Sequence, residues 1–157
     1  MSEPAIRELP TVSAITASFT GPYEQTGMVM DDLMAWLLQT GHPYSGSPFA
    51  IYYDDPAKVD EDQLRAMVCF PVAEKFDAGG GYERKEIEGG RFASLLHKGP
   101  YSGIPSTYEM IFDWIDENGF EYIEEMGTRE VFRRMMGEVD SAEELETEIL
   151  VPVKKKA

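Results

Sequence analysis

The feature that most constrains this fold is a pattern of residues that occurs twice, 78 positions apart. The tripeptide Gly-Pro-Tyr begins at Gly21 and again at Gly99. The same offset relates Trp36 to Trp114, and no gap is needed to align the stretches between them. A repeat of this kind predicts an internal duplication, in which two copies of one small unit build a domain together because neither buries enough apolar surface alone.

Each copy continues from Gly-Pro-Tyr into a stretch with helical periodicity. Its apolar residues are spaced i, i+3, i+4 and i+7, as on one face of an amphipathic helix. They are Met30, Leu33, Met34 and Leu37 in the first copy and Tyr108, Ile111, Phe112 and Ile115 in the second. In the second copy Ser106 and Glu109 have capping-box spacing, and Pro105 suits a first helical turn.

Strand-like runs of apolar and small residues flank each predicted helix. They cover residues 11–19, 48–54 and 64–72 in the first copy and 90–98, 128–135 and 146–153 in the second. Each copy is therefore predicted to be a strand-helix-strand-strand unit, with repeat one at about 11–72 and repeat two at about 90–153. Residues 74–89 are glycine-rich and indicate a linker. We expect a single α+β domain over residues 1–157, with an antiparallel sheet, two main helices and an approximate twofold axis.

The charge and composition of the chain argue against nucleic acid and membrane partners. The chain has 29 acidic and 14 basic residues and a formal net charge of −15, so its field repels phosphate backbones. We therefore expect no direct binding to nucleic acid. The one cysteine, Cys69, excludes an internal disulfide, and no signal peptide or membrane-spanning run is visible. These features predict a cytoplasmic protein with no membrane partner.

Motifs for conventional catalysis are absent from the sequence. His42 and His97 have no other ligands at metal-binding spacing, so we expect no metal. The glycine-rich run near residue 80 matches neither a P-loop nor a dinucleotide-binding pattern, and we expect no cofactor. The serines have no nucleophile-elbow sequence around them.

The two copies differ most where the second one has an acidic residue inside a strand. Glu130 aligns with Ala50, and Glu148 aligns with Met67. A carboxylate costs several kcal/mol when it is buried without a partner, so each glutamate either faces water or meets a cation or a proton. Both readings stay open at this point. Tyr23 and Tyr101 are likewise open to two readings, as packing residues at a helix start or as walls of a ligand site.

The run EIEGGRFASLLHKGPYSGIPSTYEMIFDWI, followed by TREVF and TEILVPV, resembles the GyrI-like small-molecule-binding domain. This domain occurs alone or fused to helix-turn-helix modules in bacterial activators that sense multiple drugs. The resemblance implies a cleft between the two halves that takes aromatic, often cationic molecules against glutamate and aromatic side chains. The ligand-binding residues carried over by motif are Glu130, Glu148, Tyr101, Trp114 and Phe132, with Tyr52, Met67 and Phe70 as weaker candidates.

We therefore expect a stand-alone protein that binds small molecules that are aromatic and often cationic, in the sense of drug or toxin capture. The segment before the first strand is short, so we expect no DNA-binding module and no transcription factor. Tyr101, Glu130 and Glu148 are predicted to share one cavity. Two alternatives stay open. One is a hydrolase of cyclopropane-bearing or similar electrophiles, with Glu148 or Glu130 as general base. The other is a gyrase-inhibitor-like module that binds protein.

Overall fold

The computed structural model describes residues 3–73 and 78–157, which form two α-helices and nine strands. The predicted α+β class is confirmed. Contacts divide the chain into a first unit, residues 10–89, and a second unit, which combines residues 1–9 with residues 90–157. Neither helix of the described residues is long and apolar enough to cross a bilayer.

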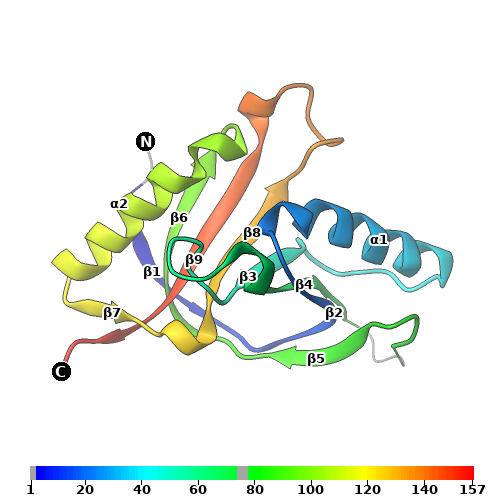
Figure 1. Cartoon of the computed structure of the whole chain (residues 1–157), viewed down its shortest axis with the longest axis horizontal. Coiled ribbons are helices and arrows are strands. Elements are labelled where there is room, and N and C mark those ends of the chain that lie inside the picture. The colour runs from blue at the N-terminus through cyan, green and yellow to red at the C-terminus, as the bar shows by residue number, and fades with distance from the viewer. Residues whose placement is uncertain (1–2, 74–77) are drawn as a thin grey trace. The chain divides into compact units, whose positions relative to one another are not determined.

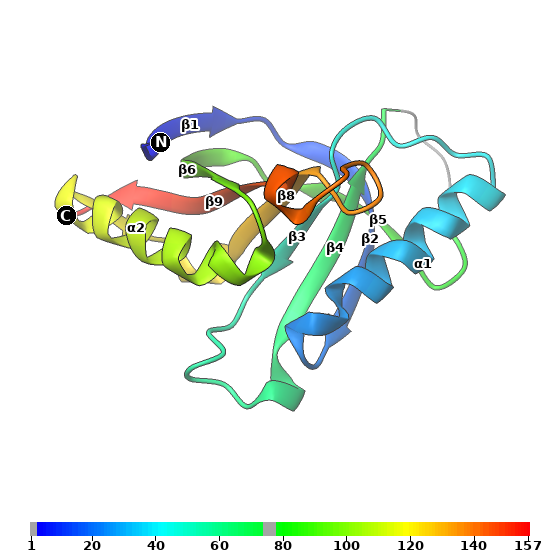
Figure 2. The same cartoon turned by 90° about the horizontal axis from the view of Figure 1, so that it is seen from above.

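The first unit packs one helix on a four-stranded antiparallel sheet. Its strands are β2 (Val12–Thr20), β3 (Phe49–Tyr52), β4 (Arg65–Pro71) and β5 (Glu83–Ile87), in the order β3-β4-β2-β5. Helix α1 (Thr26–Gln39) lies beside β2 and β4 (Figure 2). Met30, Leu33 and Leu37 are its buried apolar residues, and they belong to the predicted helical stripe. The spacing of apolar residues therefore predicted the buried side of this helix correctly.

The second unit has the same kind of layered arrangement. Its strands are β1 (Ala5–Leu9), β6 (Gly90–Lys98), β8 (Thr128–Arg134) and β9 (Glu146–Lys155), in the order β1-β6-β9-β8, and β7 (Phe120–Tyr122) pairs with the end of β9. Helix α2 (Ile104–Glu117) runs along β6 (Figure 1). Leu95, Ile111, Ile149 and Val151 are central to the apolar core between the helix and the sheet.

Both units contain the predicted order of strand, helix, strand and strand, and a Gly-Pro-Tyr turn leads into each helix. Gly21 and Gly99 have φ of 141° and 111°, a region that favours glycine. The tyrosine that follows begins a short 3₁₀ turn, η1 (Tyr23–Gln25) or η3 (Tyr101–Gly103). The division of the chain into two repeats of one domain stays a prediction.

Three expectations about local structure are wrong. Residues 83–87 of the predicted linker form β5, which pairs with β2, whereas residues 74–77 lie outside the described residues. The chain start forms β1, and β7 was also missed. These strands are short or charged, as edge strands commonly are, so no apolar alternation marked them. The capping box is wrong as well, because α2 already begins at Ile104, directly after the 3₁₀ turn.

Candidate functional site

The pairing of β8 with β9 separates the two glutamates. Glu130 lies opposite Ile149, and Val131 lies opposite Glu148. Residues that face each other in an antiparallel pair project to the same side of the sheet, and successive residues alternate. Glu130 therefore shares the side of Ile149, which packs in the core under α2, and Glu148 projects to the other side. The prediction that both glutamates line one cavity with Tyr101 is wrong.

Glu130 is a partly buried carboxyl held by a tyrosine of α2. The Tyr108 hydroxyl donates a hydrogen bond of 2.7 Å to Oε2 of Glu130, and it lies 3.3 Å from the hydroxyl of Thr128. Burial raises the pKa of Glu130, and the hydrogen bond from Tyr108 offsets only part of that rise. The charged form of Glu130 is therefore short of stabilisation, and a proton or a cation would supply it.

Tyr101 and Phe132 place two aromatic rings near this carboxyl. Their ring centroids are 6.4 Å apart in an edge-to-face arrangement, with Phe132 buried and Tyr101 41% exposed. Burial raises the pKa of Tyr101, and the negative charges of Glu130 and Glu138 raise it further. The phenol therefore stays neutral at physiological pH and keeps its proton for donation.

We call Tyr101, Tyr108, Glu130 and Phe132 the Glu130 cluster. Three of them were predicted as site residues, and Tyr108 was placed only in the helical stripe. The signal that could have found Tyr108 is its alignment with Met30, since a polar-tipped ring replaces a buried thioether. A carboxyl beside aromatic rings can replace the hydration of an organic cation by ion pairing and cation–π contact.

Glu148 is instead saturated by side chains of its own unit. Oε2 accepts hydrogen bonds from Arg7 and from Ser94, and Oε1 accepts two from Arg133. Burial pushes the pKa of Glu148 upward, but the hydrogen bonds from Ser94, Arg133 and Arg7 outweigh it, so the pKa is lowered. The side chain is only 8% exposed. Glu148 therefore meets cationic partners within the protein, namely Arg7 and Arg133.

The other predicted site residues lie elsewhere. Trp114 is near the far end of α2 from Tyr101 and stacks on Phe120, with ring centroids 6.3 Å apart. Tyr52 belongs to the first unit, where its hydroxyl donates to Thr26. Met67 and Phe70 are buried residues of β4 with opposite parity along the strand. A ligand-binding role for these four residues stays a prediction.

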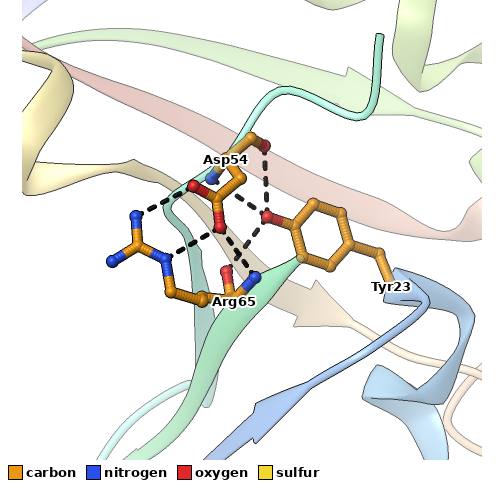
Figure 3. Close-up of polar contacts among 3 residues, drawn as sticks. All are labelled: Tyr23, Asp54 and Arg65. Atoms are coloured by element: carbon orange, nitrogen blue, oxygen red, sulfur yellow. Dashed lines mark hydrogen bonds and ion pairs between the residues drawn. The ribbon is translucent and has the colours of Figure 1, made fainter. Parts of the chain in front are cut away.

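Tyr23 occupies the position of Tyr101 in the first unit, but its hydroxyl is committed to the fold (Figure 3). It accepts a hydrogen bond of 3.0 Å from the Asp54 amide and donates toward the carbonyl oxygens of Asp54 and Arg65. The Asp54 carboxylate in turn binds the Arg65 guanidinium and amide. By contrast, the hydroxyl of Tyr101 makes no hydrogen bond to any side chain or backbone group within residues 3–73 and 78–157.

Metal-binding groups do not gather in the described part of the chain. No three side chains of His, Cys, Asp or Glu there are close enough to hold an ion. The Glu130 cluster accordingly offers one carboxyl and three aromatic rings, which suits an organic cation better than a metal ion that needs several oxygen or nitrogen ligands.

Sequence comparisons give a consistent family. The model of the GyrI-like small molecule binding domain matches residues 2–154. DNA gyrase inhibitor 2 of Dickeya dadantii (strain 3937) is 33% identical over 108 residues, which cover 64% of this chain and 66% of that protein. The chain spans about half to two thirds of the length of the curated relatives that it matches.

Two solved structures illustrate the likeness in fold. The EcmrR C-terminal domain has a TM-score of 0.84 at 20% identity, with 98% of each chain covered. SAV2435 bound to tetraphenylphosphonium has a TM-score of 0.60 at 11% identity, with 98% of this chain and 94% of that chain covered. At these identities the likeness shows the fold alone.

Proposed function

Because the chain belongs to the GyrI-like small-molecule-binding family, we propose that it captures aromatic cations at the Glu130 cluster. The observation that carries this proposal is the partly buried Glu130 carboxyl, hydrogen-bonded by Tyr108 and close to the rings of Tyr101 and Phe132. Glu148 is a poorer candidate because two arginines already neutralise it.

The chemistry of the cluster explains what kind of ligand it would prefer. A cation that leaves water loses its hydration, and the Glu130 carboxylate replaces part of it by charge pairing. Ring faces add about 0.5–2 kcal/mol for each cation–π contact. Because flat rings impose few directional constraints, ligands of several shapes can satisfy the cluster. We therefore expect broad selectivity for aromatic cations over neutral compounds of similar shape.

Tetraphenylphosphonium is a suitable first probe, because a protein of the same fold has been solved with it. Calorimetric titration should give affinity at least about tenfold higher for tetraphenylphosphonium than for neutral triphenylphosphine oxide, a difference of roughly 1.4 kcal/mol. Equal affinity for the two compounds would contradict capture through a carboxylate.

Hydrolysis is the chemical alternative, and it would also use Glu130. A glutamate whose pKa is raised by burial can act as general base toward a water molecule, whereas the lowered pKa of Glu148 makes that acid a weaker base. Incubation with a cyclopropane-bearing electrophile and mass spectrometry of the products separates turnover from capture. Capture predicts unmodified compound, and a hydrolysis product that is lost in Glu130→Gln would establish the enzyme instead.

A second candidate function is inhibition of DNA gyrase, which the names of the curated relatives favour. This function would need an exposed surface for a protein partner, and the net charge of −15 supplies acidic surface of that kind. A gyrase supercoiling assay tests it. Inhibition by the wild type that persists in Glu130→Gln would assign the chain a protein partner independent of the cluster.

A further inference from the structure

The two Gly-Pro-Tyr turns are fixed in place by different groups. In the first unit the Tyr23 hydroxyl itself ties the turn to Asp54 and Arg65. In the second unit the corresponding hydroxyl, on Tyr101, is not used in this way, and a histidine beneath the turn makes the contacts. That residue is His97 near the end of β6, and its counterpart 78 positions earlier is Phe19.

His97 uses both ring nitrogens to hold the turn and the start of α2. Nε2 lies 2.8 Å from the carbonyl oxygen of Pro100, and Nδ1 lies 2.8 Å from the hydroxyl of Thr107. A carbonyl oxygen only accepts, so Nε2 carries a proton and donates it. Nδ1 then accepts from Thr107 when the ring is neutral and donates to it when the ring is protonated. The two contacts bracket Tyr101 in sequence in either state.

The turn also packs directly on the His97 ring, at Gly103. A Cβ added to Gly103 would lie 2.9 Å from Cε1 of His97, so the turn packs on the imidazole with no room for a side chain. Strand pairing also places His97 opposite Thr147, and Thr147 opposite Phe132, in one row across β6, β9 and β8. Phe132 is the ring against which Tyr101 packs. The histidine and the phenylalanine thus stand on the same side of the sheet, at the two ends of this row.

We propose that His97 is a positioning residue for ligand recognition, which holds the turn at residues 100–103 so that the Tyr101 ring and its uncommitted hydroxyl are presented beside Glu130. The inference rests on the proposed function at the Glu130 cluster, and it adds the device that orients one wall of that site. It also gives a reason for the difference between the two turns. Anchoring through the histidine leaves the Tyr101 phenol available to a ligand, whereas anchoring through the phenol does not.

A measurement without ligand tests the positioning. In protein labelled with 3-fluorotyrosine, the ¹⁹F signal of Tyr101 is assigned by its loss in Tyr101→Phe. His97→Phe keeps a ring of similar size but removes both hydrogen bonds, so the Tyr101 signal should move toward its position in denatured protein. His97→Gln, whose amide can still donate to Pro100, should restore the signal in part. The other tyrosine signals should stay in place and report an intact fold.

Gly103→Ala is the matched second perturbation, because the residue has helical φ and ψ of −87° and −6° that alanine adopts freely. Its methyl group must displace the His97 ring, so the Tyr101 signal should move as in His97→Phe. Gly103→Ala also carries the test if His97→Phe does not fold. A Tyr101 signal that stays in place in Gly103→Ala and in folded His97→Phe would overturn the proposal.

Titration with tetraphenylphosphonium tests the consequence for binding. His97→Phe should weaken the affinity by about 2–5-fold, the factor equivalent to one exposed cation–π contact. The same change made in a Tyr101→Ala background should have no effect, because His97 acts through Tyr101. If the double variant instead loses the affinity lost in His97→Phe and in Tyr101→Ala combined, His97 does not act through Tyr101. If Glu130→Gln binds like the wild type, the proposed function fails, whereas the fluorine signals still decide whether His97 holds Tyr101.

Discussion

At the scale of single residues, the two glutamates show how the same side chain acquires opposite properties in one sheet. Glu130 meets a tyrosine hydroxyl in a partly buried position, and its pKa is raised. Glu148 meets two guanidinium groups and a serine, and its pKa is lowered. Among residues 3–73 and 78–157, Glu130 therefore has no positively charged partner, which is the property that a cation-binding group needs.

Replacement of Glu130 by glutamine should stabilise the protein at neutral pH. The folded-state pKa lies above the ordinary value of 4.5, so this carboxyl contributes stability below that value and loses it as pH rises through the folded-state pKa. Glu130→Gln should have the same melting temperature as the wild type at acidic pH. At neutral pH its melting temperature should be about 2–4 °C higher, the shift that ~1 kcal/mol produces in a chain of this size. Thermal unfolding over a pH series measures it.

Glu148→Gln is the control with the opposite sign. The lowered pKa of Glu148 contributes stability above the ordinary value of 4.5, which is lost as pH falls through the folded-state pKa. This variant should therefore melt below the wild type at neutral pH, with a difference that shrinks in acid. If Glu130→Gln is less stable than the wild type at neutral pH, the wild-type carboxylate must have a partner whose stabilisation exceeds the free-energy cost of burying the charge.

At the scale of secondary-structure elements, the two units differ at the strand-to-helix turn, where the Tyr23 hydroxyl makes hydrogen bonds within the fold and the Tyr101 hydroxyl makes none to the described residues. We expect Tyr23→Phe to destabilise the protein by about 1–3 kcal/mol, because the partly buried amide of Asp54 loses its acceptor. Tyr101→Phe should change the free energy of unfolding by less than about 0.5 kcal/mol. Urea unfolding of the two variants measures both values. Equal losses in the two would mean that both phenols serve the fold.

The sequence predicted these elements well where their residues have a clear period. Both helices and the six central strands follow from apolar spacing. Tyr101, Glu130 and Phe132 are candidate site residues by the family resemblance, and their role in binding stays a prediction. The side of the sheet taken by Glu148 could not be predicted, because the residues after it, ILVPV, are apolar on both faces. Its partner Arg7 lies 141 positions away, in a charged edge strand that showed no alternation.

At the scale of the whole molecule, the two units differ at the strand position that Glu130 occupies in the second unit. Glu130 stands where the first unit has the buried Ala50, and the acid projects to the helix side of its sheet. The net charge of −15 attracts cations to the molecule in general, but it does not desolvate them. We therefore propose that selective capture depends on the Glu130 cluster and not on the total charge.

Calorimetry tests most directly whether the Glu130 cluster captures aromatic cations. It would measure the dissociation constant of tetraphenylphosphonium at neutral pH for the wild type, Glu130→Gln and Glu148→Gln. Each variant removes one negative charge and keeps the side-chain shape, so the total charge is matched between them. We expect Glu130→Gln to weaken binding at least about tenfold and folded Glu148→Gln to stay within about twofold of the wild type. Weaker binding in Glu148→Gln with unchanged binding in Glu130→Gln would place the site on the other side of the sheet and contradict the assignment.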